Sequence, residues 1–227
     1  MLAFLRDIAN QFGRGKCWSC GTNQAGNSGF CGYCELALPR WYPACCQHLA
    51  DLSHALTEQQ CRYWFASLRW EPQTRQLMQL YKFQYRAELS SVFARILAAH
   101  ITLCYQGKPL PDSIVAMPMT EASWHKRGFH QTALVAREVA GLLDIRYVSN
   151  GLRVVREKPM QHLTSKRERW HNSHKSQLAL VDFNGQSVAV LDDVITTGAT
   201  VMAAADALYR KGAKYVDAWA IAYNQGD

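Results

Sequence analysis

The sequence predicts an α/β fold, in which a parallel sheet is flanked by helices and preceded by a small cysteine-rich module. Seven of the eight cysteines lie within the first 61 residues. Beyond them, short β-branched apolar runs alternate with helical patterns, which is typical of a parallel sheet covered on both faces. A content of 48% hydrophobic and 19% charged residues is enough for a globular core. We expect the module over residues 1–66 and the larger domain over residues 67–227.

The first residues predict a short amphipathic helix, because Leu5, Ile8 and Phe12 recur at helical spacing. Arg6 and Asp7 interrupt the apolar character, so we do not expect a secretory signal. No apolar run approaches the length of a membrane span. We therefore expect a cytoplasmic protein.

Two Cys-x-x-Cys pairs follow, Cys17 with Cys20 and Cys31 with Cys34, separated by ten residues rich in Gly and Asn. Each pair can present two thiolates to one tetrahedral ion, and the short polar link lets the four converge. Reduced surface thiols or a redox pair are the alternatives, and two matched pairs argue against both. The spacing predicts a zinc ribbon with these four ligands.

A second, poorer metal pattern comes next. Cys45, His48 and Cys61 could supply three ligands, but Trp64 stands where a fourth would be expected. Cys46 could be the fourth ligand, but it is adjacent to Cys45, and two adjacent cysteines rarely bind the same ion. The module therefore holds either one zinc ion or a second one with unusual ligands.

The larger domain opens with two helices, because apolar residues recur at helical spacing over 74–104 with an interruption around 82–86. The remaining elements follow in alternation. We expect strands at 113–118, 151–155, 188–194 and 216–222, and helices at 131–143 and 201–210.

The most informative stretch joins the strand beginning at Val188 to the helix after it. Asp192 and Asp193 follow the apolar residues 188–191, and a turn of small and hydroxyl residues comes next: Thr196, Thr197, Gly198, Ala199 and Thr200. A turn of this kind at a helix start suits a phosphate, and the carboxylates suit hydroxyls or a metal ion. A sugar phosphate with magnesium meets both conditions. The alternative is an ordinary strand, turn and helix with a capping Asp.

This run resembles the phosphoribosyl pyrophosphate signature of the type I phosphoribosyltransferases. The resemblance implies that Asp192 and Asp193 bind the ribose hydroxyls and that residues 196–200 hold the 5′-phosphate. Purine-salvage members have a further acid where Thr196 stands, whereas orotate-type members have Thr. No general base is evident, so the sequence does not identify the acceptor.

A cationic turn is predicted after the strand at 113–118, where Lys126 and Arg127 precede Gly128. It follows the carboxyl end of a strand, so we expect it at the same sheet edge as Asp192. The charge of a departing pyrophosphate could be neutralised there by Lys126, Arg127 and magnesium. A solvated basic turn is the alternative.

Residues 153–175 carry seven basic and two acidic residues, most of the net charge of +7. Ser165 and Glu168 form a capping-box pattern that predicts a short helix, with Arg169 and Asn172 on one face beside Arg167. This flap could close over a polyanionic substrate. Interleaved aromatic and His residues would also suit single-stranded DNA, and a solvated helix face is the third alternative.

The order of these motifs is similar to that of the ComF/GntX family over nearly the whole chain. Two positions differ from the family pattern: His130 replaces Asn, and Trp64 replaces a second-site Cys. The resemblance implies a phosphoribosyltransferase-like protein linked to uptake or use of external DNA, with DNA-import machinery as a possible partner. The rival hypothesis is a non-catalytic single-stranded DNA-binding or adaptor protein on the same fold. The motifs that carry the resemblance, beyond the cysteine pairs, are Arg127–Gln131, Gln161, Arg167–Asn172 and Leu191–Thr200.

Overall fold

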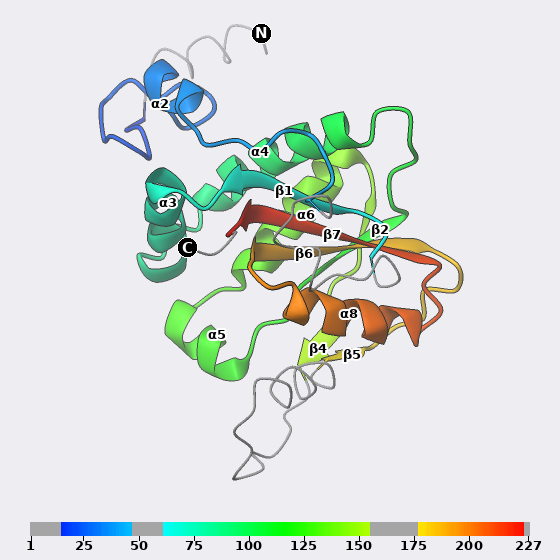
Figure 1. Cartoon of the computed structure of the whole chain (residues 1–227). Coiled ribbons are helices and arrows are strands. Elements are labelled where there is room, and N and C mark those ends of the chain that lie inside the picture. Colours follow the sequence, from blue (N-terminus) through cyan, green and yellow to red (C-terminus); the bar gives the residue numbers. More distant parts are fainter. Residues whose placement is uncertain (1–14, 47–60, 155–176, 225–227) are drawn as a thin grey trace, which may run out of the picture.

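The computed structural model describes residues 15–46, 61–154 and 177–224. At its centre lies one parallel sheet with the strand order β1-β7-β6-β2-β3 (Figure 1). In that order the strands are Trp64–Arg69, Tyr215–Tyr223, Ser187–Ile195, Ser113–Ala116 and Arg146–Tyr147. The predicted parallel sheet is confirmed.

Helices cover both faces of this sheet (Figure 1). One face packs against α3 (Pro72–Phe83), α4 (Leu89–Cys104) and α6 (Gln131–Leu143). The other packs against α8 (Ala199–Tyr209). The remaining described elements are the short helices α2 (Gly32–Leu36) and α5 (Glu121–Arg127), and an antiparallel pair of β4 (Leu152–Val154) with β5 (Gln177–Ala179).

Strand β6 shows why the central strands read as continuous apolar runs. Val188 and Val190 belong to the core beneath α8, whereas Ala189 and Leu191 belong to the core beneath the helices of the other face. All four side chains are fully buried. A strand covered on both faces needs apolar residues at every position, so it lacks the alternation of a half-exposed strand.

Most elements lie close to their predicted positions. Helix α6 has the bounds predicted for it, and α3 and α4 are separated by residues 84–88, next to the predicted interruption. Strand β6 exceeds the predicted range 188–194 by one residue at each end, and β7 runs alongside it to Tyr223. Strand β1 was not predicted, and it starts at Trp64, just before the expected domain boundary at 66/67. The division into two domains itself stays a prediction.

The expected N-terminal amphipathic helix lies outside the described residues. Within the described ranges, no helix combines the length and apolar character needed to cross a membrane.

A buried carboxylate ties the edge strand to the sheet. Asp217 of β7 is fully buried, and its two oxygens accept hydrogen bonds from Arg62 Nε (3.0 Å) and Arg62 Nη2 (2.6 Å). The Tyr105 hydroxyl donates to the same carboxylate at 2.7 Å and accepts a hydrogen bond from Trp219 Nε1 at 3.2 Å. The hydrogen bonds with Asp217 raise the pKa of Arg62, so the guanidinium keeps its charge throughout the physiological range.

We predict that Asp217→Asn destabilises the fold by about 3 kcal/mol, because it leaves the Arg62 charge uncompensated beside a buried site. Urea unfolding of the purified protein measures this change. Asp182→Asn is the matched control: it breaks the exposed pair with Lys211, which has an N···O distance of 3.1 Å, and should cost less than about 1 kcal/mol. Equal effects of the two substitutions would contradict a special role for Asp217.

Candidate functional site

The four predicted cysteine ligands converge. The Sγ atoms of Cys17, Cys20, Cys31 and Cys34 all lie within 4.8 Å of one another, and those of Cys20 and Cys31 are 3.7 Å apart. Four sulfurs bound tetrahedrally to zinc are separated by about 3.8 Å, given the Zn–S bond length. A hydrogen bond with Thr22 lowers the pKa of Cys20 to about 6, which favours the thiolate that a metal needs. The cluster can hold a metal ion, and the module fits a zinc ribbon.

Helix α3 connects this module to the larger domain. The Gln73 side chain donates hydrogen bonds to Ser19 Oγ (3.1 Å) and to the carbonyl of Cys34 (3.2 Å). Gln76 donates to the carbonyl of Ser19 at 3.3 Å. The cysteine pairs are thus held against the first half of α3. The last turn of the same helix lies beside β6.

The second metal site finds less support. Among the described residues, the four-cysteine cluster is the one group of three or more candidate ligands within 4.8 Å. Cys45 Sγ accepts a hydrogen bond from the Trp64 backbone N–H at 3.3 Å, and burial raises the pKa of Cys61. His48 lies outside the described residues. A site formed by these cysteines and His48 stays a prediction.

The acidic pair of β6 lies beside a lysine that the sequence analysis did not select. Lys82 Nζ is 2.6 Å from Asp193 Oδ2, and both side chains are only 15% exposed. The Asp193 backbone N–H donates to Asp192 Oδ1 at 2.8 Å. Burial, and then the Asp193 charge, raise the pKa of Asp192 to about 7. Asp193 is thus ion-paired with Lys82, and Asp192 is easier to protonate than an ordinary aspartate.

The turn after β6 has the conformation expected of an anion site. Gly198 is the N-cap of α8 with φ +76° and has no side chain to cap the helix, and the Thr197 hydroxyl accepts a long hydrogen bond (3.5 Å) from the Ala199 N–H. Thr196, Thr197 and Thr200 are exposed around it, Gly198 is buried and Ala199 is half-buried. The first N–H groups of α8 and the positive end of its dipole thus lie at the turn that joins the acidic strand to the helix.

Lys126 and Arg127 end a helix rather than forming the predicted flexible turn. Thr120 caps α5 by accepting a hydrogen bond from the Ser123 N–H, and Gly128 closes it with φ +72°. The Lys126 ammonium lies 5.4 Å from the centroid of the Phe83 ring at the end of α3, and the Arg127 guanidinium lies 6.0 Å from it. Both cations thus pack against the helix end that supplies Lys82.

Lys82 is the functional candidate that sequence reasoning missed. Its only sequence signal was its position at the start of the interrupted stretch 82–86, which indicated a helix end and not a site. The predicted flap residues Arg167, Arg169 and Asn172 lie outside the described residues.

Comparison with known proteins gives a consistent result. Residues 129–227 match the family model described as phosphoribosyl transferase domain. The DNA utilization protein YhgH of Salmonella typhi is 30% identical over 207 residues, which cover 90% of this chain and 82% of that protein. The Escherichia coli K12 protein of the same name is 28% identical, with coverage of 91% and 96%.

Competence protein F of Haemophilus influenzae is 28% identical over 152 residues, covering 64% of this chain and 66% of that protein. The alignments with the two YhgH proteins cover about nine tenths of this chain, so they extend well beyond residues 129–227. The chain belongs to the ComF/GntX family of phosphoribosyltransferase-like proteins.

Proposed function

We propose that this protein binds phosphoribosyl pyrophosphate together with magnesium, in a process that takes up or uses external DNA. The observation that carries the proposal is the order of two groups at the carboxyl end of β6: an acidic pair, and then a helix start. Two carboxylates of β6 are followed, after one short turn, by the start of α8 at Gly198. Carboxylates accept hydrogen bonds from ribose hydroxyls, and a helix start binds the 5′-phosphate. The names of the relatives support the link to DNA.

In this proposal Asp192 and Asp193 orient the ribose, and residues 196–200 hold its 5′-phosphate. Lys126 and Arg127 would receive the pyrophosphate end of the ligand. Magnesium is commonly held by one or two carboxylates and by phosphate oxygens of the ligand, which fits the donor set of the acidic pair. When bound, it would neutralise pyrophosphate charge. Orientation of the ligand and electrostatic stabilisation of the leaving pyrophosphate would then accelerate its displacement, so no nucleophilic side chain is needed.

Lys82 removes an electrostatic objection to this arrangement. Two ionised aspartates next to a phosphate would repel it, but the Lys82 ammonium compensates one of them at 2.6 Å. The site then presents about one net negative charge toward hydroxyls and metal.

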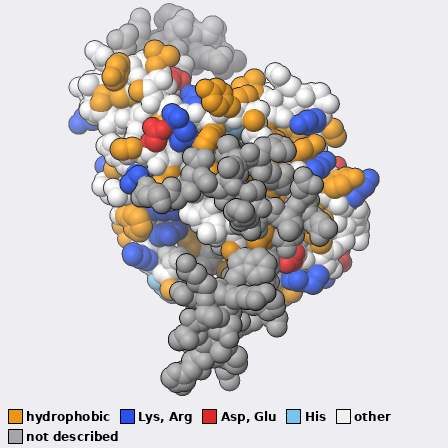
Figure 2. All heavy atoms as spheres, in the orientation of Figure 1, with side chains coloured by type: hydrophobic (Ala, Val, Ile, Leu, Met, Phe, Trp, Pro, Cys, Tyr) orange, Lys and Arg blue, Asp and Glu red, His pale blue; other side chains and the backbone are white. Residues whose placement is uncertain are grey.

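The second candidate function is binding of single-stranded DNA. It is favoured by the net charge of +7 and by the names of the relatives. On the face shown in Figure 2, Lys and Arg side chains are spread over the visible surface rather than gathered into one stripe. The flap that the sequence offered for DNA lies almost wholly outside the described residues. An adaptor role toward DNA-import machinery rests on the family process alone.

Combined Asp192→Asn and Asp193→Asn substitutions should weaken magnesium-dependent phosphoribosyl pyrophosphate binding by about 100-fold or more, since two charge-assisted contacts are lost. Isothermal titration calorimetry measures this affinity. Unchanged affinity would reject the assigned site. In parallel, binding of an oligothymidylate that falls steeply with salt and survives the double substitution would support the DNA-binding function instead.

Lys82→Met should weaken the same binding by about tenfold, because Asp193 loses its compensating charge and repels the phosphate. Lys82→Arg should restore most of the affinity, since it keeps the positive charge. Lys214→Met, at an exposed lysine just before β7, is the control and should leave the affinity unchanged. A loss that Lys82→Arg does not restore would indicate a packing role for Lys82 instead.

We further propose that the four-cysteine cluster holds zinc. Elemental analysis of the purified protein should give one zinc ion per chain, and Cys17→Ser should abolish it. Cys104→Ala, at a buried cysteine outside the cluster, should retain the ion. Two ions per chain would support the second site with Cys45, His48 and Cys61, and none would reject the zinc ribbon.

A further inference from the structure

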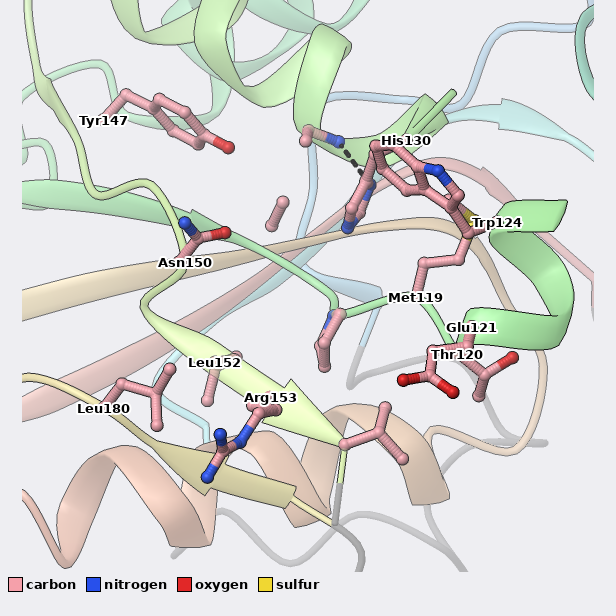
Figure 3. A pocket seen from close by; sticks show the side chains of 14 residues that line it. Met119, Thr120, Glu121, Trp124, His130, Tyr147, Asn150, Leu152, Arg153 and Leu180 are labelled. Atoms are coloured by element: carbon pink, nitrogen blue, oxygen red, sulfur yellow. Dashed lines mark hydrogen bonds between the residues drawn. The ribbon is translucent and has the colours of Figure 1, made fainter. Parts of the chain in front are cut away.

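The antiparallel pair of β4 and β5 packs on the side of α8 that faces away from the central sheet (Figure 1). Leu152 of β4 and Ala179 of β5 belong to the same core cluster as Val201 and Met202 of the helix. Figure 3, which labels Arg153 of β4, shows both strands beside α8. The helix that begins at the proposed phosphate turn is therefore held between the sheet and this pair.

One buried side chain of the pair reaches the start of α8. Gln177, the first residue of β5, is only 4% exposed. Its Nε2 donates hydrogen bonds to the backbone carbonyl of Thr200 at 3.1 Å and to Met117 Sδ at 3.2 Å. A carbonyl and a thioether can only accept hydrogen bonds, so these partners fix the orientation of the amide. The NH₂ group of Gln177 therefore faces the first turn of the helix.

The same amide also lies next to the end of the acidic strand. Met117 directly follows β2, and its backbone N–H donates a hydrogen bond to the carbonyl of Leu191 at 2.8 Å. Leu191 immediately precedes Asp192 in β6. Gln177 is thus placed where β5, the carboxyl end of β2 and the first turn of α8 meet.

The first turn of α8 has few restraints of its own. Its N-cap is Gly198 in a left-handed conformation, and glycine restrains the backbone less than other residues do. Within the turn, the hydrogen bond from the Ala199 N–H to the Thr197 hydroxyl is 3.5 Å long. The first N–H groups of a helix have no partner inside it, so they converge on one phosphate only if the turn is held in place. The shorter hydrogen bond from Gln177 to Thr200 supplies such a restraint.

Stability alone does not explain a glutamine at this position. Gln177 Oε1 is buried and accepts no hydrogen bond from the residues that the structure describes. A buried acceptor without a partner costs free energy, whereas an apolar side chain of the same length, such as methionine, avoids that cost. The benefit of the glutamine therefore comes from the groups that its Nε2 holds.

We propose that Gln177 is a positioning residue, whose amide holds the first turn of α8 in the conformation that binds the 5′-phosphate. It acts through the carbonyl of Thr200 and does not contact the ligand. The inference rests on the proposed function, which assigns residues 196–200 to this phosphate, and adds to it a residue from a different element. Binding of the 5′-phosphate end should depend on Gln177, and binding of the pyrophosphate end at Lys126 and Arg127 should not.

The test is calorimetric titration of the full-length protein, in the presence of magnesium, with three probes: phosphoribosyl pyrophosphate, ribose 5-phosphate and inorganic pyrophosphate. Gln177→Met keeps the length of the side chain and removes the donor. It should weaken binding of both sugar phosphates by about fivefold, the effect of one lost hydrogen bond, and leave pyrophosphate binding unchanged. This selectivity separates a positioning role from a general structural one.

Gln186→Met is the matched control. The Gln186 side chain accepts a hydrogen bond from Arg146 Nη2 at 2.8 Å, and it lies just before β6, at the amino-terminal edge of the sheet. The same substitution there should change none of the three affinities. Urea unfolding of Gln177→Met should give the wild-type midpoint, because the unpaired Oε1 is removed together with the donor. A lower midpoint with weaker binding of all three probes would identify a packing role and overturn the proposal.

Failure of this inference and failure of the proposed function give different results. If the wild-type protein binds the sugar phosphates and Gln177→Met binds them equally well, the inference alone is overturned. If the wild-type protein binds none of the three probes, the proposed function fails, and the inference fails with it. A loss confined to the two sugar phosphates supports both.

Discussion

The ion pair between Lys82 and Asp193 is the interaction on which the candidate site depends. It joins a helix to the central strand β6 at a point where two adjacent carboxylates would otherwise repel each other. Both side chains are largely buried, so water screens the pair little and removal of either partner leaves a charge uncompensated. The acidic pair can therefore stay at the strand end with one carboxylate fixed and the other available.

Helix α3 gains a central position from this pair. Its first half donates hydrogen bonds to the cysteine module through Gln73 and Gln76. Its last turn supplies Lys82 to β6 and the Phe83 ring to the cations that end α5. The Tyr81 hydroxyl donates to the backbone carbonyl of Gln131, at the start of α6. One helix of 12 residues thus contacts the cysteine module, the acidic pair and the cationic helix end.

The sequence predicted those features that depend on neighbouring residues. Helix α6, the buried strand before Asp192 and the paired cysteines each follow from local periodicity or spacing. Strand β1 was missed because its partner, β7, is about 150 residues away, and nothing local marks that pairing. Lys82 was missed for the same reason, since its role comes from a contact between two distant elements. The Lys126 and Arg127 helix was taken for a turn although Thr120 and Gly128 signal both of its ends.

The strand order has a consequence for how the chain is made. Strand β7, the last of the described strands to be synthesised, lies between β1 and β6 and pairs with both. While the ribosome is still translating, β1 and β6 can have no such neighbour, and each presents an unpaired edge of backbone amides and carbonyls. Slow closure of such long-range pairs exposes a nascent chain to aggregation, so chaperone assistance would matter most before residues 215–223 emerge.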